Sequence, residues 1–460
     1  METTSPVGRP GSAREVLAVF SRLGVTSFGG PVAHLGYFHE AFVERRGWIS
    51  ERAYADLVAF CQFLPGPASS QVGMAIGWRR AGIPGLLAAW AGFTLPSALL
   101  LLGFAYGVDA VGDLEGAGWI TGLKAAAVAV VAQAVLGMAR SLANTRATAT
   151  IAGGAVIVLL LLPATGMPLA LVQIAVIVAA GLAGLWWIAP PSSAPEGAAP
   201  ADGALAVDDR TDGREVGDGG SPTDGRTDGR SGADDGDDAD DRSATDDGER
   251  LAGVVSPGAA IACLVAFALA LVLLPLWAAL AGPGGIAGLV DTFYRAGSLV
   301  FGGGHVVLPL LQAETAGTVT HDEFLAGYGA AQAVPGPLFT FAGYLGAVST
   351  SGPGGAWGAA IALVAVFAPS ALLVVGALPY WDRLRRAAGA QRALAGVSAG
   401  VVGLLAAAFY DPVFTQGVLA APSPSSALAL VVAAYVALTQ WKTPPWAVVI
   451  GAGVLAAFVA

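Results

Sequence analysis

Apolar runs of roughly 20 residues, the length that a helix needs to cross a ~30 Å hydrocarbon core, recur along nearly the whole sequence. Because lipid offers no hydrogen-bond partners, such runs must be helical, and no segment alternates with the period of a membrane barrel strand. Only 12% of the residues are charged, about half the share in an average soluble domain, and the mean hydropathy is +0.67. We therefore predict an all-α polytopic membrane protein.

The acidic residues are concentrated between two apolar halves, in residues 191–250. This stretch carries 18 acidic and 6 basic side chains, so its net charge is −12, and the rest of a chain of net charge −10 is mildly basic. Its composition predicts a disordered linker, with an acidic partner-binding segment as the alternative. A mildly basic membrane body argues against a cation pore lined by carboxylates and is compatible with an anionic substrate.

The two halves repeat the same motifs in the same order, which indicates an internal duplication. Arg22 and Arg295 lie 273 residues apart, six residues before the paired motifs Phe28-Gly29-Gly30-Pro31 and Phe301-Gly302-Gly303-Gly304. The motifs Gln62-Phe-Leu-Pro65-Gly66-Pro67 and Gln332-Ala-Val-Pro335-Gly336-Pro337 follow at a spacing of 270. Pro96-Ser97 and Pro369-Ser370 then restore the spacing of 273.

Length and breaker residues predict about six elements in each half. Those of the first half are 14–33, 54–77, 83–107, 119–140, 149–163 and 168–189, and those of the second are 286–311, 324–348, 356–379, 392–409, 424–441 and 445–460. A further run at 255–281 has no counterpart, which makes about 13 spans. The expected units are a repeat at 1–190, the linker at 191–250, a connecting transmembrane helix at 251–285 and a second repeat at 286–460.

An odd number of crossings before the second copy would insert it upside down, giving an inverted repeat with broken helices. Loop charges agree, since the sign reverses between equivalent loops that contain Asp109, Asp113 and Glu115 in one half and Arg383, Arg385 and Arg386 in the other. The positive-inside rule then places the N-terminus and the linker in the cytoplasm. Two loops fit less well, because Arg45 and Arg46 would lie outside and the acidic loop near Glu314 inside.

The glycine and proline motifs predict interruptions of the helices within the bundle. Consecutive glycines permit a bend, and each proline of a Pro-Gly-Pro motif removes a backbone donor. The N–H groups freed where a helix restarts can hold an oxyanion. Isolated motifs of this kind more often serve close packing. Their pairing across the duplication favours a binding site in a transporter instead.

Polar side chains near these breaks are further candidates for substrate binding. Arg22 and Arg295 could clamp an oxyanion, or they could extend to the membrane surface from apolar surroundings. Gln62 and Gln332 could donate to substrate oxygens, with interhelical bonding as the alternative.

Other charged or titratable residues lie where they could support substrate binding or proton coupling. His34 and His305 lie just beyond the glycine breaks and could carry a coupling proton, although they are one register out of alignment. Lys124 and Arg392 could add a second positive shell, but anchoring at the membrane edge is the simpler interpretation.

The sequence contains no zinc-ligand spacing, phosphate-binding loop or nucleophile elbow, so we expect no metal, cofactor, nucleic-acid partner or enzymatic activity. Cys61 and Cys263 sit in apolar runs and are expected to be inert thiols. Residues 1–12 lack the features of a secretory signal, so the spans themselves are expected to direct insertion.

The glycine and Pro-Gly-Pro motifs of both halves, together with Gly47-Trp48-Ile49-Ser50, resemble the chromate ion transporter family in its long, two-domain form. The resemblance covers both halves but not the linker, and Gly304 stands where the first copy has Pro31. It implies a carrier in the plasma (inner) membrane that exports chromate, confers resistance and uses the membrane potential or a proton gradient.

Several alternatives stay open at this point. Sulfate is an isosteric competitor of chromate, because both are tetrahedral dianions, and another oxyanion transporter or an anion channel is compatible with the same motifs. A lipid-handling protein would need a large amphipathic cavity, and a scaffold or sensor would place its function in the linker. A homodimer is compatible with the sequence.

Overall fold

The computed structural model describes residues 11–111, 118–162, 167, 169–189, 255–282, 284–301 and 307–459. All regular elements in these ranges are helical, and an isolated bridge between Ala316 and Val319 closes a turn. The predicted all-α class is therefore confirmed for the described part of the chain. The described residues of 11–189 and 255–459 form one compact unit. The predicted linker at 191–250 and the predicted site residues Gly302, Gly303 and His305 lie outside the described residues.

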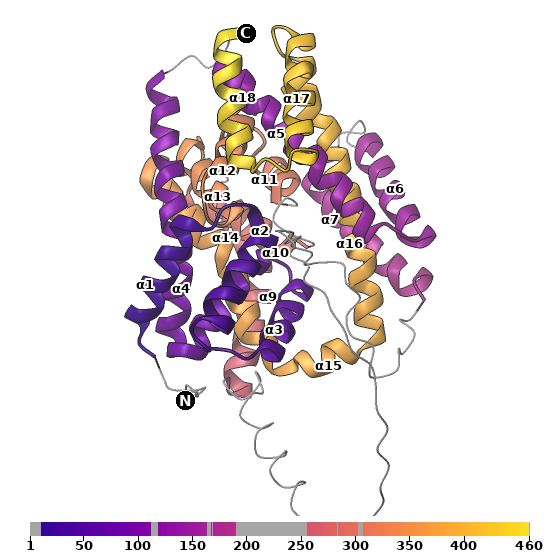
Figure 1. Ribbon diagram of the computed structural model, residues 1–460. Coiled ribbons are helices and arrows are strands. Elements are labelled where there is room, and N and C mark those ends of the chain that lie inside the picture. The colour runs from indigo at the N-terminus through magenta and orange to yellow at the C-terminus, as the bar shows by residue number, and fades with distance from the viewer. Residues whose placement is uncertain are drawn as a thin grey trace, which may run out of the picture. The chain divides into compact units, whose positions relative to one another are not determined.

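Both halves consist of a succession of helices (Figure 1). The first half has α1 Ala13–Thr26, α2 Gly30–Phe38, the π-helical turn η1 His39–Glu44, α3 Glu51–Phe63, α4 Ala68–Val111, α5 Gly118–Leu142, α6 Arg146–Leu161 and α7 Leu169–Trp187. After α9 Pro257–Ala281, the second half has α10 Ile286–Leu299, α11 Val307–Thr315, α12 His321–Ala333, η5 Leu338–Thr340, α13 Phe341–Val348, α14 Gly355–Ala377, η6 Leu378–Tyr380, α15 Trp381–Arg386, α16 Ala388–Ala408, η7 Phe409–Leu419, α17 Pro424–Thr439 and α18 Pro445–Val459.

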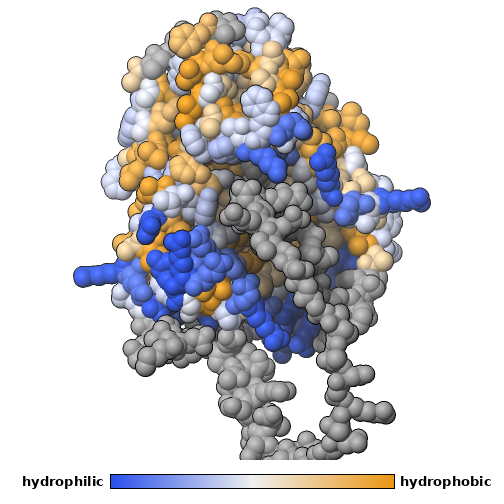
Figure 2. All heavy atoms as spheres, in the orientation of Figure 1, coloured by the Kyte–Doolittle hydropathy of each residue, from blue (hydrophilic) through white to orange (hydrophobic). Residues whose placement is uncertain are grey.

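Five of the described helical stretches are long and apolar enough to cross a membrane, namely Ala68–Val108, Gly118–Leu142, Pro257–Ala281, Gly355–Arg386 and Ala388–Leu419. Five shorter helical stretches in the described ranges are also apolar. Large apolar side chains cover much of the outer surface, and hydrophilic side chains gather in a few patches on the face drawn in Figure 2. A surface of this kind suits contact with lipid.

The predicted element 14–33 is not one helix, because α1 ends at Thr26 and the chain turns back at Gly29 and Gly30. At 14 residues, α1 spans roughly 21 Å, less than a ~30 Å hydrocarbon core. The same turn-back occurs after α3, and α4 is itself interrupted at Ala81 and Gly82. The first half therefore opens with two helical hairpins.

Contacts around Arg80 show that both hairpins start and finish at one end of the molecule. The backbone N–H of Gly11 donates to the Arg80 carbonyl at 2.9 Å, and the Arg80 guanidinium pairs with Glu15 at 3.1 Å. The same guanidinium lies over the Trp48 ring, 4.8 Å from its centroid. The loop that contains Arg45 and Arg46 therefore lies at the same end as Gly11 and Arg80, which corrects the expectation that this loop lies on the side opposite the N-terminus.

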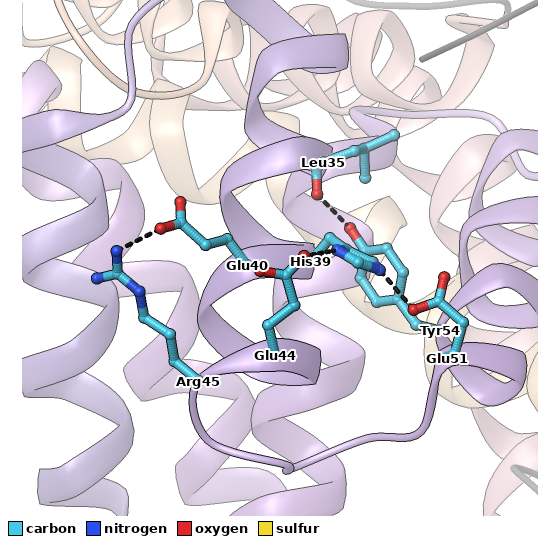
Figure 3. Close-up of polar contacts among 7 residues, drawn as sticks. All are labelled: Leu35, His39, Glu40, Glu44, Arg45, Glu51 and Tyr54. Carbon is cyan, nitrogen blue, oxygen red and sulfur yellow. Dashed lines mark hydrogen bonds and ion pairs between the residues drawn. The ribbon is translucent and has the colours of Figure 1, made fainter. Parts of the chain in front are cut away.

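A group of polar contacts joins the end of the first hairpin to the beginning of the second (Figure 3). The His39 ring lies between two carboxylates, with Nδ1 3.0 Å from Glu44 and Nε2 2.6 Å from Glu51. The Tyr54 hydroxyl donates to the Leu35 carbonyl at 2.6 Å. These contacts fix α2 against the first turns of α3.

The second half repeats the hairpin arrangement. The Gly352 N–H donates to the Gly284 carbonyl at 2.9 Å, which is the counterpart of the contact between Gly11 and Arg80. The Thr350 N–H donates to the Thr318 carbonyl at 2.9 Å. The beginning of α10, the loop after α11 and the loop after α13 therefore lie together at one end.

The equivalent long helices α4 and α14 pack side by side and run in opposite directions. Near the end of α4, the Tyr106 hydroxyl accepts from the Ala356 N–H at the start of α14, at 3.0 Å. Farther back on α4, the Trp90 ring lies 6.1 Å from the ring of Phe367, which is farther along α14. The last three helices of each half pack against those of the other half. The first-half helix α5 packs against α17 and α18, and the second-half helix α16 packs against α6 and α7.

Candidate functional site

Two backbone hydrogen bonds connect the helix breaks of one half to the other half, and we call these two contacts the crossings. The N–H of Gly66, in the first Pro-Gly-Pro motif, donates to the carbonyl of Val300 at 2.6 Å, just before the second glycine motif. Reciprocally, the N–H of Gly336 donates to the carbonyl of Ser27 at 2.8 Å, just before the first glycine motif. Each Pro-Gly-Pro break is therefore held against the segment that precedes the glycine motif of the other half.

Both central glycines are required by their surroundings. Gly66 has φ +122° and Gly336 has φ +96°, a region that side-chain-bearing residues rarely adopt. A Cβ on Gly66 would collide with the Ser370 hydroxyl, and one on Gly336 would lie 2.6 Å from the Ser97 hydroxyl. The sequence shows Pro96-Ser97 and Pro369-Ser370 as part of the duplication but does not indicate their role. In the structure, the serine of each pair contacts the Pro-Gly-Pro break of the other half.

A cavity of about 620 Å³ lies beside one of these crossings. Its lining includes Gly29, Gly30 and Pro31 of the first half with Gln332 and Gly336 of the second. The rest of its lining comes from α2, α5, the end of α12 with the residues up to η5, and the segment from the end of α17 to the start of α18: Val32, Val130, Gln133, Ala134, Gly137, Met138, Ser141, Ala331, Val334, Leu338, Leu438, Lys442, Thr443, Pro444 and Pro445. The structure thus brings together one predicted motif from each half.

The cavity offers hydrogen-bond donors with little negative charge. The α2 helix begins beside Gly29 without a side-chain cap, so its positive dipole end and the N–H groups of its first turn, except at Pro31, which has none, face this region. The Gln332 side chain lines the cavity, and its amide lies within hydrogen-bonding reach of the Tyr328 hydroxyl, with a second N–H left to donate. Lys442 supplies a cation, and no Asp or Glu is found among the described residues that line the cavity. This donor set suits an oxyanion.

The α5 contribution to the cavity was not anticipated from the sequence. Gln133, Gly137 and Ser141 recur every four residues, which places them on one face of a helix. This small and polar stripe within an apolar helix is the signal that could have identified them. Lys442 and Thr443 carried no comparable signal, because they lie in a short turn between two apolar helices.

The two arginines of the predicted clamp lie outside this cavity lining and have different surroundings. Arg22 is exposed on α1, and the described residues place no acid within ion-pair distance of it. Arg295 is partly buried and pairs with Asp291 at 2.7 Å and Glu314 at 2.9 Å. The clamp stays a prediction, although the structure does not bring the two guanidinium groups to the cavity.

The remaining predicted polar residues are dispersed. Gln62 is exposed and does not line the 620 Å³ cavity, in contrast to Gln332. His34 is 1% exposed, with Nδ1 3.4 Å from the Ser69 hydroxyl and its ring edge-to-face with Phe93. Lys124 pairs with Asp322 at 2.6 Å, which ties α5 to the start of α12. A proton-coupling role of His34 stays untested.

The aromatic and proline residues of the motifs serve the turns themselves. Phe28 packs its ring 6.0 Å from that of Trp446, and Phe301 packs against the main apolar cluster. The carbonyls of Pro65 and Pro67 accept from the side chain and backbone of Gln71, at 2.7 and 2.9 Å. In the second half, Pro335 and Pro337 flank Gly336, and the Pro337 carbonyl accepts from Thr340 at 2.8 Å.

Several fully buried hydroxyl groups lie near the two crossings and have no hydrogen-bond partner among the described residues. They belong to Ser27, Ser70, Thr94 and Ser370. Buried hydroxyls of this kind normally find a partner in protein, water or ligand. No group of three or more His, Cys, Asp or Glu side chains that could hold a metal is found within the described ranges.

Comparison with known proteins identifies the family. The Chromate transporter family model matches residues 14–185 and 287–457. A chromate transport protein of Pseudomonas aeruginosa is 27% identical over 436 residues, which cover 89% of this chain and 83% of that protein. A probable chromate transport protein of Synechococcus elongatus is 30% identical over 138 residues, covering 29% of this chain and 34% of the relative.

A chromate transport protein of Cupriavidus metallidurans is 33% identical over 123 residues, which cover 26% of this chain and 30% of that protein. No solved structure was found to match the chain. The family match covers both halves, including the glycine and Pro-Gly-Pro motifs that meet at the crossing and, in part, at the cavity. The chain belongs to the chromate transporter family.

Proposed function

We propose that this protein is a secondary active transporter that exports chromate across the plasma membrane and thereby confers chromate resistance. The observation that carries the proposal is the cavity in which the uncapped start of α2 meets Gln332 and Gly336. Its volume of about 620 Å³ exceeds many times the ~30 Å³ of a water molecule, so a tetrahedral dianion fits together with part of its hydration shell. Sulfate shares this shape and charge and is the alternative substrate.

The proposed mechanism is alternating access by two inverted halves. Antiparallel packing of α4 and α14 and the reciprocal bonds of Gly66 and Gly336 support an inverted repeat. In such repeats, interrupted helices form the binding site and one half rocks against the other. The N-terminus is proposed to be cytoplasmic, at the end of the molecule that carries Arg45, Arg46 and Arg80. A homodimer is compatible with this arrangement.

Transport is tested by uptake of labelled chromate into inverted membrane vesicles that contain the full chain. Export from cells corresponds to uptake here, and it should be reduced by excess sulfate if the site recognises tetrahedral dianions. A protonophore tests dependence on the proton gradient. Absence of accumulation under any imposed gradient, compared with vesicles that lack the chain, would contradict export. If the chromate that has entered the vesicles leaks out passively at a high rate, the result would favour the anion channel.

The location of the site is tested by filling the cavity. Gly137 lines it, and a Cβ there would meet no atom within 4 Å, so Gly137→Leu should project into the cavity without disturbing the backbone. Gly103 on α4 is equally open but is not among the lining residues, which makes Gly103→Leu the matched control. We expect Gly137→Leu to reduce chromate transport about tenfold or more, equivalent to ~1.4 kcal/mol, with little change for Gly103→Leu.

A further inference from the structure

A compact group of three charged side chains joins the two arms of the first hairpin of the second half. The Arg295 guanidinium donates to the Asp291 carboxylate at 2.7 Å and pairs with the Glu314 carboxylate at 2.9 Å, both through the same terminal nitrogen. Asp291 and Arg295 lie one turn apart on α10, and Glu314 lies near the end of α11. The two carboxylates therefore share one cation.

The group is enclosed, and its formal charges do not balance. The Asp291 and Glu314 side chains are 10% and 7% exposed, and two carboxylates beside one guanidinium leave an excess of one negative charge. An uncompensated charge in a poorly solvated site is costly. Binding of a single proton by either carboxylate makes the group neutral, while the guanidinium keeps a partner.

Neighbouring helices provide no obvious counter-charge. The helices packed against α10 and α11 are α7, α9, α14 and α16. The sequences of α7 and α14 contain no titratable side chain, α9 contributes Cys263, and α16 contributes Arg392 at its beginning. On α10 itself, the Tyr294 hydroxyl donates to the Phe267 carbonyl at 3.2 Å. Within the described part of the chain, the unbalanced charge thus remains with the two carboxylates.

The group lies on the elements that lead to the crossing. The α10 helix ends one residue before Val300, whose carbonyl accepts from Gly66, and α11 is the returning arm of the same hairpin. The first half has no equivalent group, because Ala18 stands where the second half has Asp291 and Arg22 is exposed. A change of charge between the two arms would therefore act on one break only.

We propose that Asp291, Arg295 and Glu314 form a proton-binding site that couples proton movement to anion transport. The proposal rests on the proposed transport function, and it places the coupling proton on carboxylates rather than on the histidines considered from the sequence. The proton binds one carboxylate oxygen from the aqueous phase on one side and leaves on the other, so no covalent bond of the substrate is made or broken.

The test uses the purified full chain in liposomes and compares two assays. The first is exchange of labelled for unlabelled chromate at equal pH on both sides, which requires substrate binding and movement but no net proton flow. The second is net accumulation driven by a pH gradient, with the membrane potential held at zero by potassium and valinomycin. We expect the wild-type protein to perform both.

Glu314→Gln and Asp291→Asn should retain exchange and lose accumulation driven by the pH gradient. Glu314→Asp keeps a titratable group and should retain gradient-driven accumulation, which separates proton binding from a purely structural role. Asp382→Asn removes an exposed acid that pairs with Arg385 and serves as the control. Because chromate itself binds protons, each variant is compared with the wild type at the same pH values.

The outcomes separate this proposal from the proposed function. Absence of chromate exchange in the wild-type protein would contradict the function itself. Normal exchange with gradient-driven accumulation retained in both neutral variants would overturn the proton site. If neither neutral variant reaches the membrane, the wild-type protein still decides, because exchange without any response to the pH gradient would overturn the coupling.

Discussion

The two halves share a backbone arrangement but differ in the side chains that surround it. Gly66 and Gly336 make reciprocal hydrogen bonds to the opposite half, and Ser370 and Ser97 abut them in the same way. Because these contacts depend on main-chain groups and on the absence of a side chain, divergence elsewhere leaves them intact. The duplicated motifs thus identify the parts that the two copies must keep in common.

Polarity after the Pro-Gly-Pro breaks is the clearest difference between the halves. Ser69, Ser70 and Gln71 follow the first break, and all three are buried. The equivalent positions of the second half are Phe339, Thr340 and Phe341, and the two phenylalanines pack against other aromatic rings. The three residues that follow the first break are therefore polar, whereas two of the three that follow the second break are aromatic.

The paired arginines follow the same pattern of divergence. Arg295 shares two buried carboxylates, whereas Arg22 is exposed and has no acid beside it in the described part of the chain. The cavity is also asymmetric, since its lining includes the glycine motif at Gly29 and Gly30 from the first half and Gln332 from the second half. A duplication that is symmetric in backbone therefore supports a site that is not symmetric in chemistry.

The largest expected difference between the halves concerns these arginines. Arg295→Gln leaves two buried carboxylates without their cation and should destabilise the protein by about 3–5 kcal/mol. Arg22→Gln removes an exposed side chain and should change stability by no more than ~0.5 kcal/mol. Thermal unfolding in detergent, followed by size-exclusion profiles, measures both.

Transport by the Arg22→Gln variant tests whether Arg22 binds the anion as the predicted clamp requires. An Arg22→Gln protein that is stable but inactive would restore a direct role for this side chain. Wild-type kinetics would assign Arg22 to the membrane surface and confine the functional arginine to the second half.

The crossing glycines should behave alike, in contrast to the arginines. Gly66→Ala and Gly336→Ala each place a Cβ against a serine hydroxyl of the other half at positive φ, at a cost of about 1–3 kcal/mol. Gly258→Ala on α9, where a Cβ would meet nothing within 4 Å, is the neutral control. Unfolding temperature and chromate exchange should fall together in both crossing variants.

Removal of the opposing serine separates collision from backbone strain. The double variant with Gly66→Ala and Ser370→Ala should recover part of the lost stability, because the clash is relieved while the positive φ remains. Full stability in the Gly66→Ala variant but not in the Gly336→Ala variant would show that the reciprocal contacts are not equivalent.

The two glutamines are expected to differ in substrate affinity. Gln332 lines the cavity and its amide can donate to an anion there, so Gln332→Leu should raise the KM for chromate about tenfold, the value of one hydrogen bond to a charged group. Gln62 is exposed and is not among the residues that line the cavity, so Gln62→Leu should leave KM nearly unchanged. Equal effects of both substitutions would indicate a second, equivalent site and would contradict the asymmetric cavity.

Much of the architecture could be predicted from the sequence, because the features that determine it are local. Apolar length and breaker residues predicted the helices, and the duplicated motifs around Gly66 and Gly336 predicted that helices are interrupted at both positions. The hairpins were missed, since an apolar run from 14 to 33 looks continuous until the positive φ of Gly29 and Gly30 reverses it. The length of an apolar run shows how hydrophobic a segment is, but it does not show where the chain reverses direction.

The chemistry of the site was less predictable, because it depends on which elements approach each other. Gln133 and Ser141 become relevant only when α5 packs beside the first glycine break, and Arg295 meets Glu314 only because α11 folds back along α10. Equal positions in a repeat suggested equal roles for Arg22 and Arg295. The acids that distinguish them lie on different helices, and no repeat pattern in the sequence points to them.

The smallest expected effect is at Lys442, the cation of the cavity lining. It lies exposed at positive φ (+52°) in the turn between α17 and α18, where water screens its charge. Lys442→Gln should raise the KM for chromate about two- to threefold at low ionic strength, in line with the ~0.5 kcal/mol of an exposed charge pair. In 1 M salt the Debye length falls to about 3 Å, so the difference from the wild type should disappear. An effect that persists at high salt would mean that the ammonium contacts the anion directly, which would make the turn between α17 and α18 part of the binding site rather than its rim.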